Sequence, residues 1–157
     1  VWSVTSFNEL ARDGMACDEY NRLHPLTETA QESWVSKQLR HTDGIVVSAT
    51  DHMRAYSEQI RGYLPDNRPY VTLGTDGYGR SDTRGNLRSY FGVDAAHIVV
   101  ATLKKLADEG EVENRLVKDA ISSFELDTDR PVAWAPQEHP QVQAVAEYHE
   151  YQAGEGN

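Results

Sequence analysis

Residues 74–84 form a loop whose residue types could bind a charged group. They read G-T-D-G-Y-G-R-S-D-T-R and lie between a predicted strand and a predicted helix. The stretch from Gly74 to Ser81 nearly matches the pattern G-x-x-x-x-G-K-[ST], in which backbone N–H groups of a glycine-rich loop hold phosphates. Phosphate binding is therefore one hypothesis for this loop.

Two residues of the loop argue against nucleotide hydrolysis. Arg80 stands where the phosphate-binding pattern has a lysine, and a guanidinium does not replace the compact charge of an ammonium group. Asp76 would place a negative charge among the bound phosphates. The apolar strand predicted over Gly44–Ala49 also supplies no terminal aspartate for magnesium. A phosphate- or nucleotide-binding module therefore stays an alternative only.

The charged residues of the loop, Asp76, Arg80, Asp82 and Arg84, allow two further interpretations. They could pair among themselves across a turn that the glycines permit. They could instead dock a neighbouring domain or chain, because the carboxyl ends of parallel strands face clefts and partners. We favour docking, so these four residues are the candidate interface.

No other segment carries a catalytic or metal-binding pattern. The six histidines are scattered, without an H-E-x-x-H or comparable ligand spacing. Cys17 is the only cysteine, which excludes an internal disulfide and a cysteine-based zinc site. No G-x-S-x-G pattern supplies a nucleophilic serine. From the residues alone we predict no catalytic, cofactor-binding or metal-binding residue.

The composition is that of one acidic, globular domain. The 157 residues include 25 acidic and 15 basic side chains, which gives a formal net charge of −10. This charge repels phosphate groups and argues against nucleic-acid and anionic-membrane partners. No apolar run approaches the roughly 20 residues that cross a bilayer. With a single cysteine as well, we expect a cytoplasmic protein.

The last 31 residues differ from the rest of the chain. Val, Ile, Leu and Phe provide 29 of the first 126 residues but only 3 of the last 31, which also carry six acids and one arginine. Such a segment buries too little apolar surface to offset the entropy of ordering it. We expect a domain over residues 1–126 and an acidic, proline-containing tail over residues 127–157. Trp134 is expected to anchor this tail on the domain or on a partner.

Hydrophobic patterns predict strands that alternate with helices, and hence a parallel sheet. Strands are expected at Val1–Ser6, Gly44–Ala49 and Tyr70–Leu73, and Ser6 with Glu9 has the spacing of a helix-capping box. Before the second predicted strand we expect a helix from Ser6 to about Leu23, which Gly14 weakens, and a helix over Thr29–Arg40. Between the second and third predicted strands we expect a helix from Thr50 or Asp51 to Leu64. After the third we expect a short helix that contains Leu87 and Phe91 and ends at Gly92, one from Asp94 through Leu103, and one from Leu116 to Phe124.

Three long strings make the chain similar to a known family. They are V-W-S-V-T-S-F-N-E-L-A-R-D-G (Val1–Gly14), N-R-L-H-P (Asn21–Pro25) and L-G-T-D-G-Y-G-R-S-D-T-R-G-N-L-R (Leu73–Arg88). They resemble the homodimeric pyruvate dehydrogenases, the thiamine-diphosphate-dependent decarboxylating first components of the pyruvate dehydrogenase complex. The resemblance extends to about Asp127 and covers only that family's C-terminal domain.

The resemblance implies a transketolase-like C-terminal domain, which is a three-layer α/β sandwich with a mostly parallel sheet. It also implies that the domain's first strand and helix precede Val1. In such enzymes thiamine diphosphate and magnesium bind to the upstream domains. The family's diphosphate motif begins G-D-G, which Gly74–Gly77 interrupts, so no catalytic residue of the family carries over to this chain.

The implied role is that of a scaffold within an enzyme that decarboxylates pyruvate. The acetyl group would pass to lipoyl groups on the dihydrolipoamide acetyltransferase core, and this domain would support the homodimer that builds the active sites. Two alternatives stay open: the same domain of a 2-oxobutanoate dehydrogenase, and a free-standing phosphate- or nucleotide-binding α/β module.

Overall fold

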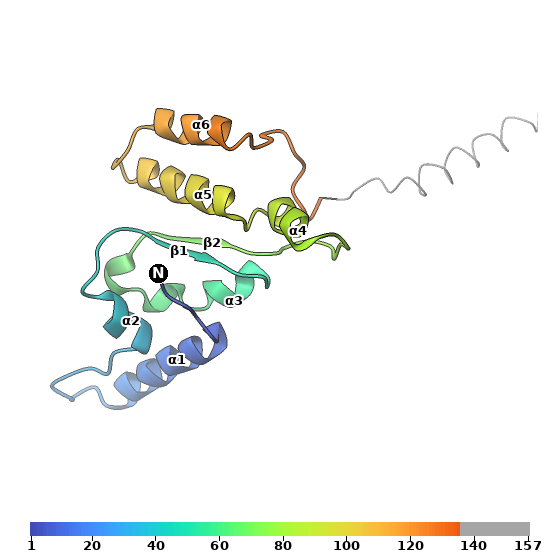
Figure 1. Ribbon diagram of the computed structural model, residues 1–157. Helices are drawn as coiled ribbons and strands as arrows, with labels where there is room; N and C mark the ends of the chain where they lie inside the picture. The colour runs from blue at the N-terminus through green and yellow to red at the C-terminus, as the bar shows by residue number, and fades with distance from the viewer. Residues whose placement is uncertain (136–157) are drawn as a thin grey trace, which may run out of the picture.

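A small parallel sheet lies between two layers of helices in the computed structural model, which describes residues 1–135 (Figure 1). Strand β1 (Val46–Ala49) pairs with β2 (Tyr70–Leu73), with Val46 opposite Tyr70 and Ala49 opposite Leu73. The strands are parallel and one crossover connects them. The prediction of a layered α/β fold with a parallel sheet is confirmed.

One face of the sheet is covered by the chain that precedes β2. This layer contains α1 (Phe7–Leu23), α2 (Trp34–Leu39) and α3 (Arg54–Glu58), followed by two short 3₁₀ turns. The main buried apolar cluster lies here and consists of Val35, Ile60, Leu64 and Tyr70, with Phe7, Leu10, Leu39, Val46 and Tyr63 packed around it.

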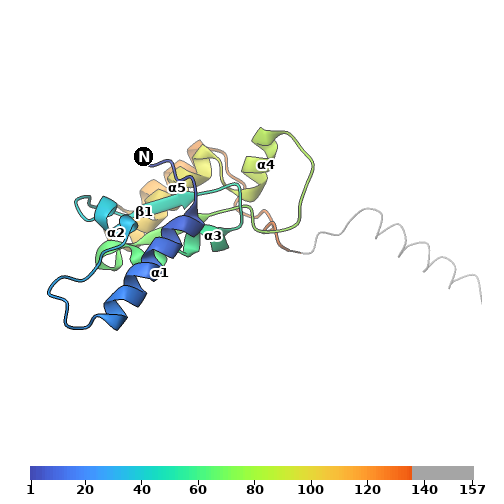
Figure 2. The same cartoon turned by 90° about the horizontal axis from the view of Figure 1, so that it is seen from below.

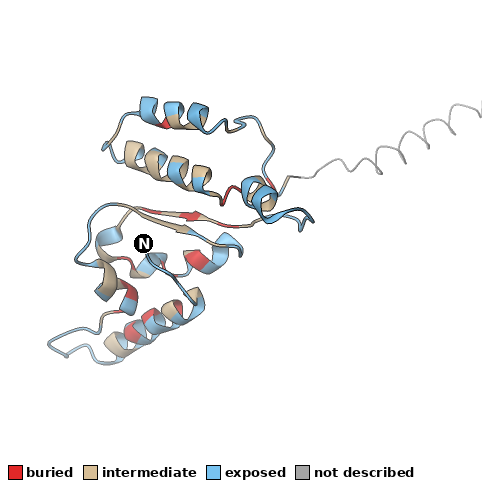
Figure 3. Ribbon diagram, viewed as in Figure 1, coloured by how far each residue is buried: buried red, intermediate tan, exposed pale blue. Residues whose placement is uncertain are grey.

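The opposite face is covered by the chain that follows β2. Helix α5 (Ala95–Asp108) contacts both strands, and α6 (Asn114–Ser123) packs against α5 as the outer helix. Helix α4 (Arg84–Phe91) stands beside the carboxyl ends of the strands, at the end of a long loop from β2 (Figure 2). Buried positions are found on β2, α1 and α3 and in the turn before α5, whereas most helical surface is exposed or half-buried (Figure 3).

Local signals fixed the ends of several helices as expected. The Ser6 hydroxyl accepts a hydrogen bond from the Glu9 N–H at 3.2 Å and begins α1. The Asp94 carboxylate accepts from the His97 N–H at 2.9 Å and begins α5. Gly92 ends α4 in the left-handed conformation, with φ of 69°. These caps depend on neighbouring residues only, which is why the sequence predicts them.

Three expected elements differ from the structure. Residues 1–6 form no strand, because no strand among the described residues pairs with them. The helix expected over Thr29–Arg40 begins only at Trp34, since the backbone of Gln31 instead exchanges hydrogen bonds of 2.7 and 2.9 Å with the Asn21 side chain. The helix expected from Thr50 or Asp51 begins at Arg54 and ends at Glu58.

Gly14 does not interrupt α1, although we expected it to weaken the helix. A Cβ atom at this position would lie 2.5 to 2.6 Å from three ring carbons of Tyr63. The missing side chain therefore makes room for the Tyr63 ring against the helix. Within residues 1–135 no helix is both long enough and apolar enough to cross a membrane.

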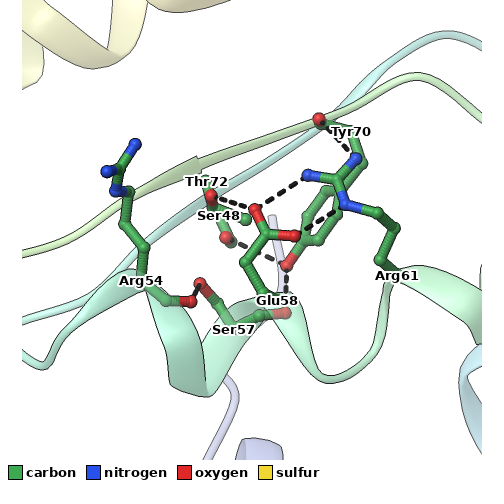
Figure 4. A network of polar contacts seen from close by, with 7 residues as sticks. All are labelled: Ser48, Arg54, Ser57, Glu58, Arg61, Tyr70 and Thr72. Atoms are coloured by element: carbon green, nitrogen blue, oxygen red, sulfur yellow. Dashed lines mark hydrogen bonds and ion pairs between the residues drawn. The ribbon is translucent and has the colours of Figure 1, made fainter.

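A network of polar side chains joins α3 to the sheet, and we call it the polar clamp (Figure 4). Arg61 donates to both carboxylate oxygens of Glu58, at 2.6 and 2.8 Å, and to the backbone carbonyl of Tyr70 at 3.1 Å. The Thr72 hydroxyl donates to the same carboxylate at 2.5 Å. Glu58 thus connects the end of α3 to strand β2 directly and through Arg61.

Tyr70 forms the buried half of the polar clamp. Its hydroxyl donates to the backbone carbonyl of Ser57 at 2.9 Å and lies 3.0 Å from the Ser48 hydroxyl on β1. The Arg61 guanidinium lies 4.9 Å from the centre of the Tyr70 ring. Burial raises the pKa of the Tyr70 phenol, so this group stays a neutral donor. Each polar atom of this interior thereby has a partner.

Replacing Tyr70 by Phe tests the buried half of the clamp. The change removes the hydroxyl donor from the Ser57 carbonyl, which keeps the more distant Ile60 N–H at 3.4 Å, and it removes the partner of the Ser48 hydroxyl. We therefore expect the free energy of unfolding to fall by about 1–2 kcal/mol. Urea denaturation measures it. Tyr78→Phe is the matched control, because Tyr78 is 75% exposed and should change stability by less than about 0.5 kcal/mol. Equal stability of the two variants would contradict a structural role for the Tyr70 hydroxyl.

The pH dependence of stability tests the ionic half of the clamp. Hydrogen bonding to Arg61 lowers the pKa of Glu58 below its ordinary value of 4.5. The stability that this carboxylate contributes is therefore complete above the ordinary pKa and lost as pH falls through the lowered one. Glu58→Gln should have a lower free energy of unfolding than the native protein at about pH 6. This difference between the two proteins should become smaller towards about pH 3.

Urea denaturation at several pH values measures this difference. Glu28→Gln is the control, because Glu28 is exposed and forms no ion pair among residues 1–135. If the difference in free energy of unfolding between Glu58→Gln and the native protein is the same at every pH, the carboxylate is not stabilised by Arg61.

Candidate functional site

The loop after β2 begins fixed to the segment after β1. The Thr50 N–H donates to the Leu73 carbonyl at 3.0 Å, and the Thr75 N–H donates to the His52 carbonyl at 2.9 Å. The Thr75 hydroxyl also donates to the Asp51 carbonyl at 2.8 Å. These bonds extend the pairing of the strands beyond their carboxyl ends, so the base of the loop is held at this edge of the sheet.

Gly74 and Asp76 bring the loop against the start of α3. A Cβ atom on Gly74 would lie 2.6 Å from both the Arg54 nitrogen and the His52 carbonyl oxygen, so the backbones approach closely only because this residue is glycine. One carboxylate oxygen of Asp76 accepts from the Arg54 N–H at 3.2 Å and from its guanidinium at 2.9 Å. Asp76 therefore pairs with α3.

The other predicted interface residues have separate partners. The Asp82 carboxylate accepts from the Asn86 amide at 2.8 Å and from the Thr83 N–H at 2.7 Å. These two hydrogen bonds, that from Asn86 first, lower the pKa of Asp82. The Arg80 guanidinium lies 4.8 Å from the centre of the Tyr90 ring. The interpretation in which the four charges pair among themselves is therefore wrong for the described residues.

A surface cavity of about 500 Å³ separates the loop from α4. Arg80, Asp82 and Arg84 line it, whereas Asp76 does not. The structure thus brings three of the four predicted residues to one cavity at the carboxyl end of the sheet. The cavity is also lined by Asp51, Thr75, Gly77, Gly79, Leu87, Arg88, Phe91 and Val93.

Residues 130–134, which we call the strap, lie across the same loop. The Arg130 guanidinium donates to the Ser89 carbonyl at 2.6 Å, and Ala133 is buried. Gly77 has a φ of 131°, and a Cβ atom on it would lie 2.5 Å from the Ala133 carbonyl oxygen. The Arg54 guanidinium lies 5.4 Å from the centre of the Trp134 ring. The end of the described chain thus contacts the candidate interface.

Residues 136–157 of the predicted tail lie outside the described residues. The division into a domain over residues 1–126 and a tail over 127–157 stays a prediction.

Sequence reasoning missed the partners that hold the loop. Arg54 lies 22 residues before Asp76 and no local pattern connects them. Arg88 could have been predicted from the sequence to lie beside Arg84, because it follows Arg84 by one helical turn. Among residues 1–135 no group of three or more His, Cys, Asp or Glu could hold a metal ion. The cavity beside α4 is lined by charged and apolar residues, and its lining within the described part of the chain contains no histidine, cysteine or serine. The Asp94–His97 pair, with 2.6 Å between Oδ1 and Nδ1, does not line this cavity.

Comparisons with known proteins cover most of the chain. A family model described as "Transketolase-like TK C-terminal domain" matches residues 1–94. The "Pyruvate dehydrogenase E1 component" of Escherichia coli (strain K12) is 48% identical over 130 residues, which is 83% of this chain. The proteins of the same name from Cupriavidus necator and Pseudomonas aeruginosa are 49% and 46% identical over 131 and 130 residues. The chain spans about 14% of the length of these relatives.

Replacing Gly77 by Ala tests the contact between the loop and the strap. The new methyl group meets the Ala133 carbonyl in a backbone conformation that side chains rarely adopt, so we expect a loss of about 1–3 kcal/mol of stability. The tryptophan fluorescence, to which Trp2, Trp34 and Trp134 contribute, should also change as Trp134 in the strap is displaced. The measurements are urea denaturation and fluorescence spectra.

Gly79→Ala is the matched control in the same loop. A Cβ atom on Gly79 has no neighbour within 4 Å. This variant should therefore keep native stability and the native spectrum. If both variants behave alike, the strap does not pack on Gly77 in solution.

Proposed function

Because this chain belongs to the family of transketolase-like C-terminal domains, we propose that it is the C-terminal domain of a pyruvate dehydrogenase first component. The observation that supports this most is 46 to 49% identity to three proteins of that name over 130 or 131 residues. The proposed enzyme decarboxylates pyruvate with thiamine diphosphate and passes the acetyl group to a lipoyl group of an acyltransferase core.

The residues described here do not fit a diphosphate–magnesium site. Within residues 1–135 no group of three or more His, Cys, Asp or Glu could hold a metal ion, and the cavity beside α4 has more arginines than carboxylates in its lining, which does not suit a cation. Of the two acidic residues in the loop over residues 74–84, Asp76 is held by Arg54, and Asp82 accepts from Asn86 and Thr83. We therefore assign no catalytic step to this chain and propose that the cofactors bind elsewhere in the longer enzyme.

The role left for this domain is that of a scaffold in a homodimer. The loop from Asp76 to Arg84 lies at the open carboxyl edge of the sheet, and Tyr78 in it is 75% exposed. The fixed base of the loop and its exposed tip suit a rigid docking element. We propose that Asp76, Arg80, Asp82 and Arg84 support the dimer interface, and that this assembly is cytoplasmic.

The names of these relatives support pyruvate, and not 2-oxobutanoate, as the substrate. Selectivity between these 2-oxo acids would be decided outside this chain, since no described residue offers a site for the reacting carbon. The free-standing phosphate-binding module gains no support from relatives, all of which are much longer proteins.

The full-length enzyme tests the scaffold role. The double variant Arg80→Ala/Arg84→Ala should weaken the dimer about tenfold or more in sedimentation analysis, because it removes two charges from the interface. Decarboxylation of pyruvate per intact dimer should stay near native. Arg115→Ala on α6 is the control and should keep the native dimer. Native sedimentation of the double variant would reject the interface.

A further inference from the structure

The cavity beside α4 holds an excess of arginine in a chain that is strongly acidic. Arg80, Arg84 and Arg88 line it, against Asp51 and Asp82. The carboxylate of Asp82 is already engaged by Thr83 and Asn86. The chain has ten more acidic than basic residues, yet among residues 1–135 none of these arginines forms an ion pair.

Two of these arginines, Arg84 and Arg88, are the best placed to bind an anion together. They lie one turn apart on α4, and both line the cavity. Two like charges at this spacing repel each other and destabilise a helix. An anion between them removes that repulsion, and guanidinium groups bind phosphate oxygens in a bidentate manner.

The other lining residues indicate what kind of molecule would carry the anionic group. Leu87, Phe91 and Val93 form an apolar part of the lining. Gly79 allows a ligand to approach the backbone, because a Cβ atom on it would have no neighbour within 4 Å. A volume of about 500 Å³ suits a small organic molecule. The position at the carboxyl ends of parallel strands is the usual place for ligands in open α/β sheets.

We propose that this cavity binds a small organic phosphate monoester, with its phosphate held by Arg84 and Arg88 and its apolar body against Leu87 and Phe91. The site is separate from the cofactor site proposed for the longer enzyme. It rests on the proposed function, because Arg80 and Arg84 line the cavity and also belong to the proposed dimer interface. Arg80, whose guanidinium lies 4.8 Å from the centre of the Tyr90 ring, also lines the cavity.

Calorimetric titration of the full-length enzyme with phenyl phosphate tests the site. The enzyme is first saturated with thiamine diphosphate and magnesium, which blocks the cofactor site. Phenyl phosphate should bind in a saturable manner, more tightly than inorganic phosphate, which lacks the apolar body, or benzoate, which lacks the phosphate dianion. Arg88→Gln should weaken binding about tenfold or more, whereas Arg115→Gln on α6 should leave it unchanged.

Three outcomes would overturn the proposal. They are the absence of saturable binding in the millimolar range, equal affinity in the native enzyme and in Arg88→Gln, and an Arg88→Gln enzyme that binds phenyl phosphate normally but separates into monomers. The last outcome would assign the arginines to docking of a protein chain. Pyruvate decarboxylation, measured in parallel, reports on the proposed function independently of phenyl phosphate binding.

Discussion

The fold depends on the polar contacts between α3 and the sheet. These are the ion pair between Glu58 and Arg61 and the hydrogen bonds of the buried Tyr70 hydroxyl. A two-stranded sheet of four residues per strand has little stability of its own. The clamp supplies what the strands lack, because it ties β2 to α3 through Arg61, Thr72 and the Ser57 carbonyl. The Tyr70 hydroxyl and Ser57 form the buried part of this network, whereas the Glu58–Arg61 pair is partly exposed to solvent.

The same constraint determines where the candidate interface lies. Helix α3 begins at Arg54, whose N–H and guanidinium hold Asp76, and it ends at Glu58 in the clamp. A single short helix thus connects the core to the glycine-rich loop. Gly74 and Gly77 permit the close approaches on either side of Asp76, to α3 and to the strap. A loop fixed in this way suits recognition, because little conformational freedom remains to be lost on binding.

Elements that depend on neighbouring residues could be predicted from the sequence, and those that depend on distant partners could not. The caps at Ser6 and Asp94 and the apolar runs of both strands are local signals. The alternating valines of residues 1–6 predict a strand wrongly, because alternation says nothing about whether a partner strand is present. The pairing of Asp76 with Arg54 joins segments 22 residues apart, and only the tertiary structure selects it.

Native-state hydrogen exchange in the Tyr70→Phe variant tests most directly whether the clamp positions the loop. The Thr75 N–H bonds across to the His52 carbonyl beyond the strands, so its protection reports on the loop base. If the clamp positions this loop, the Thr75 amide should lose protection by the same factor as the amides of β2. Unchanged protection of Thr75 alongside weakened protection in β2 would show that the loop is held independently of the clamp.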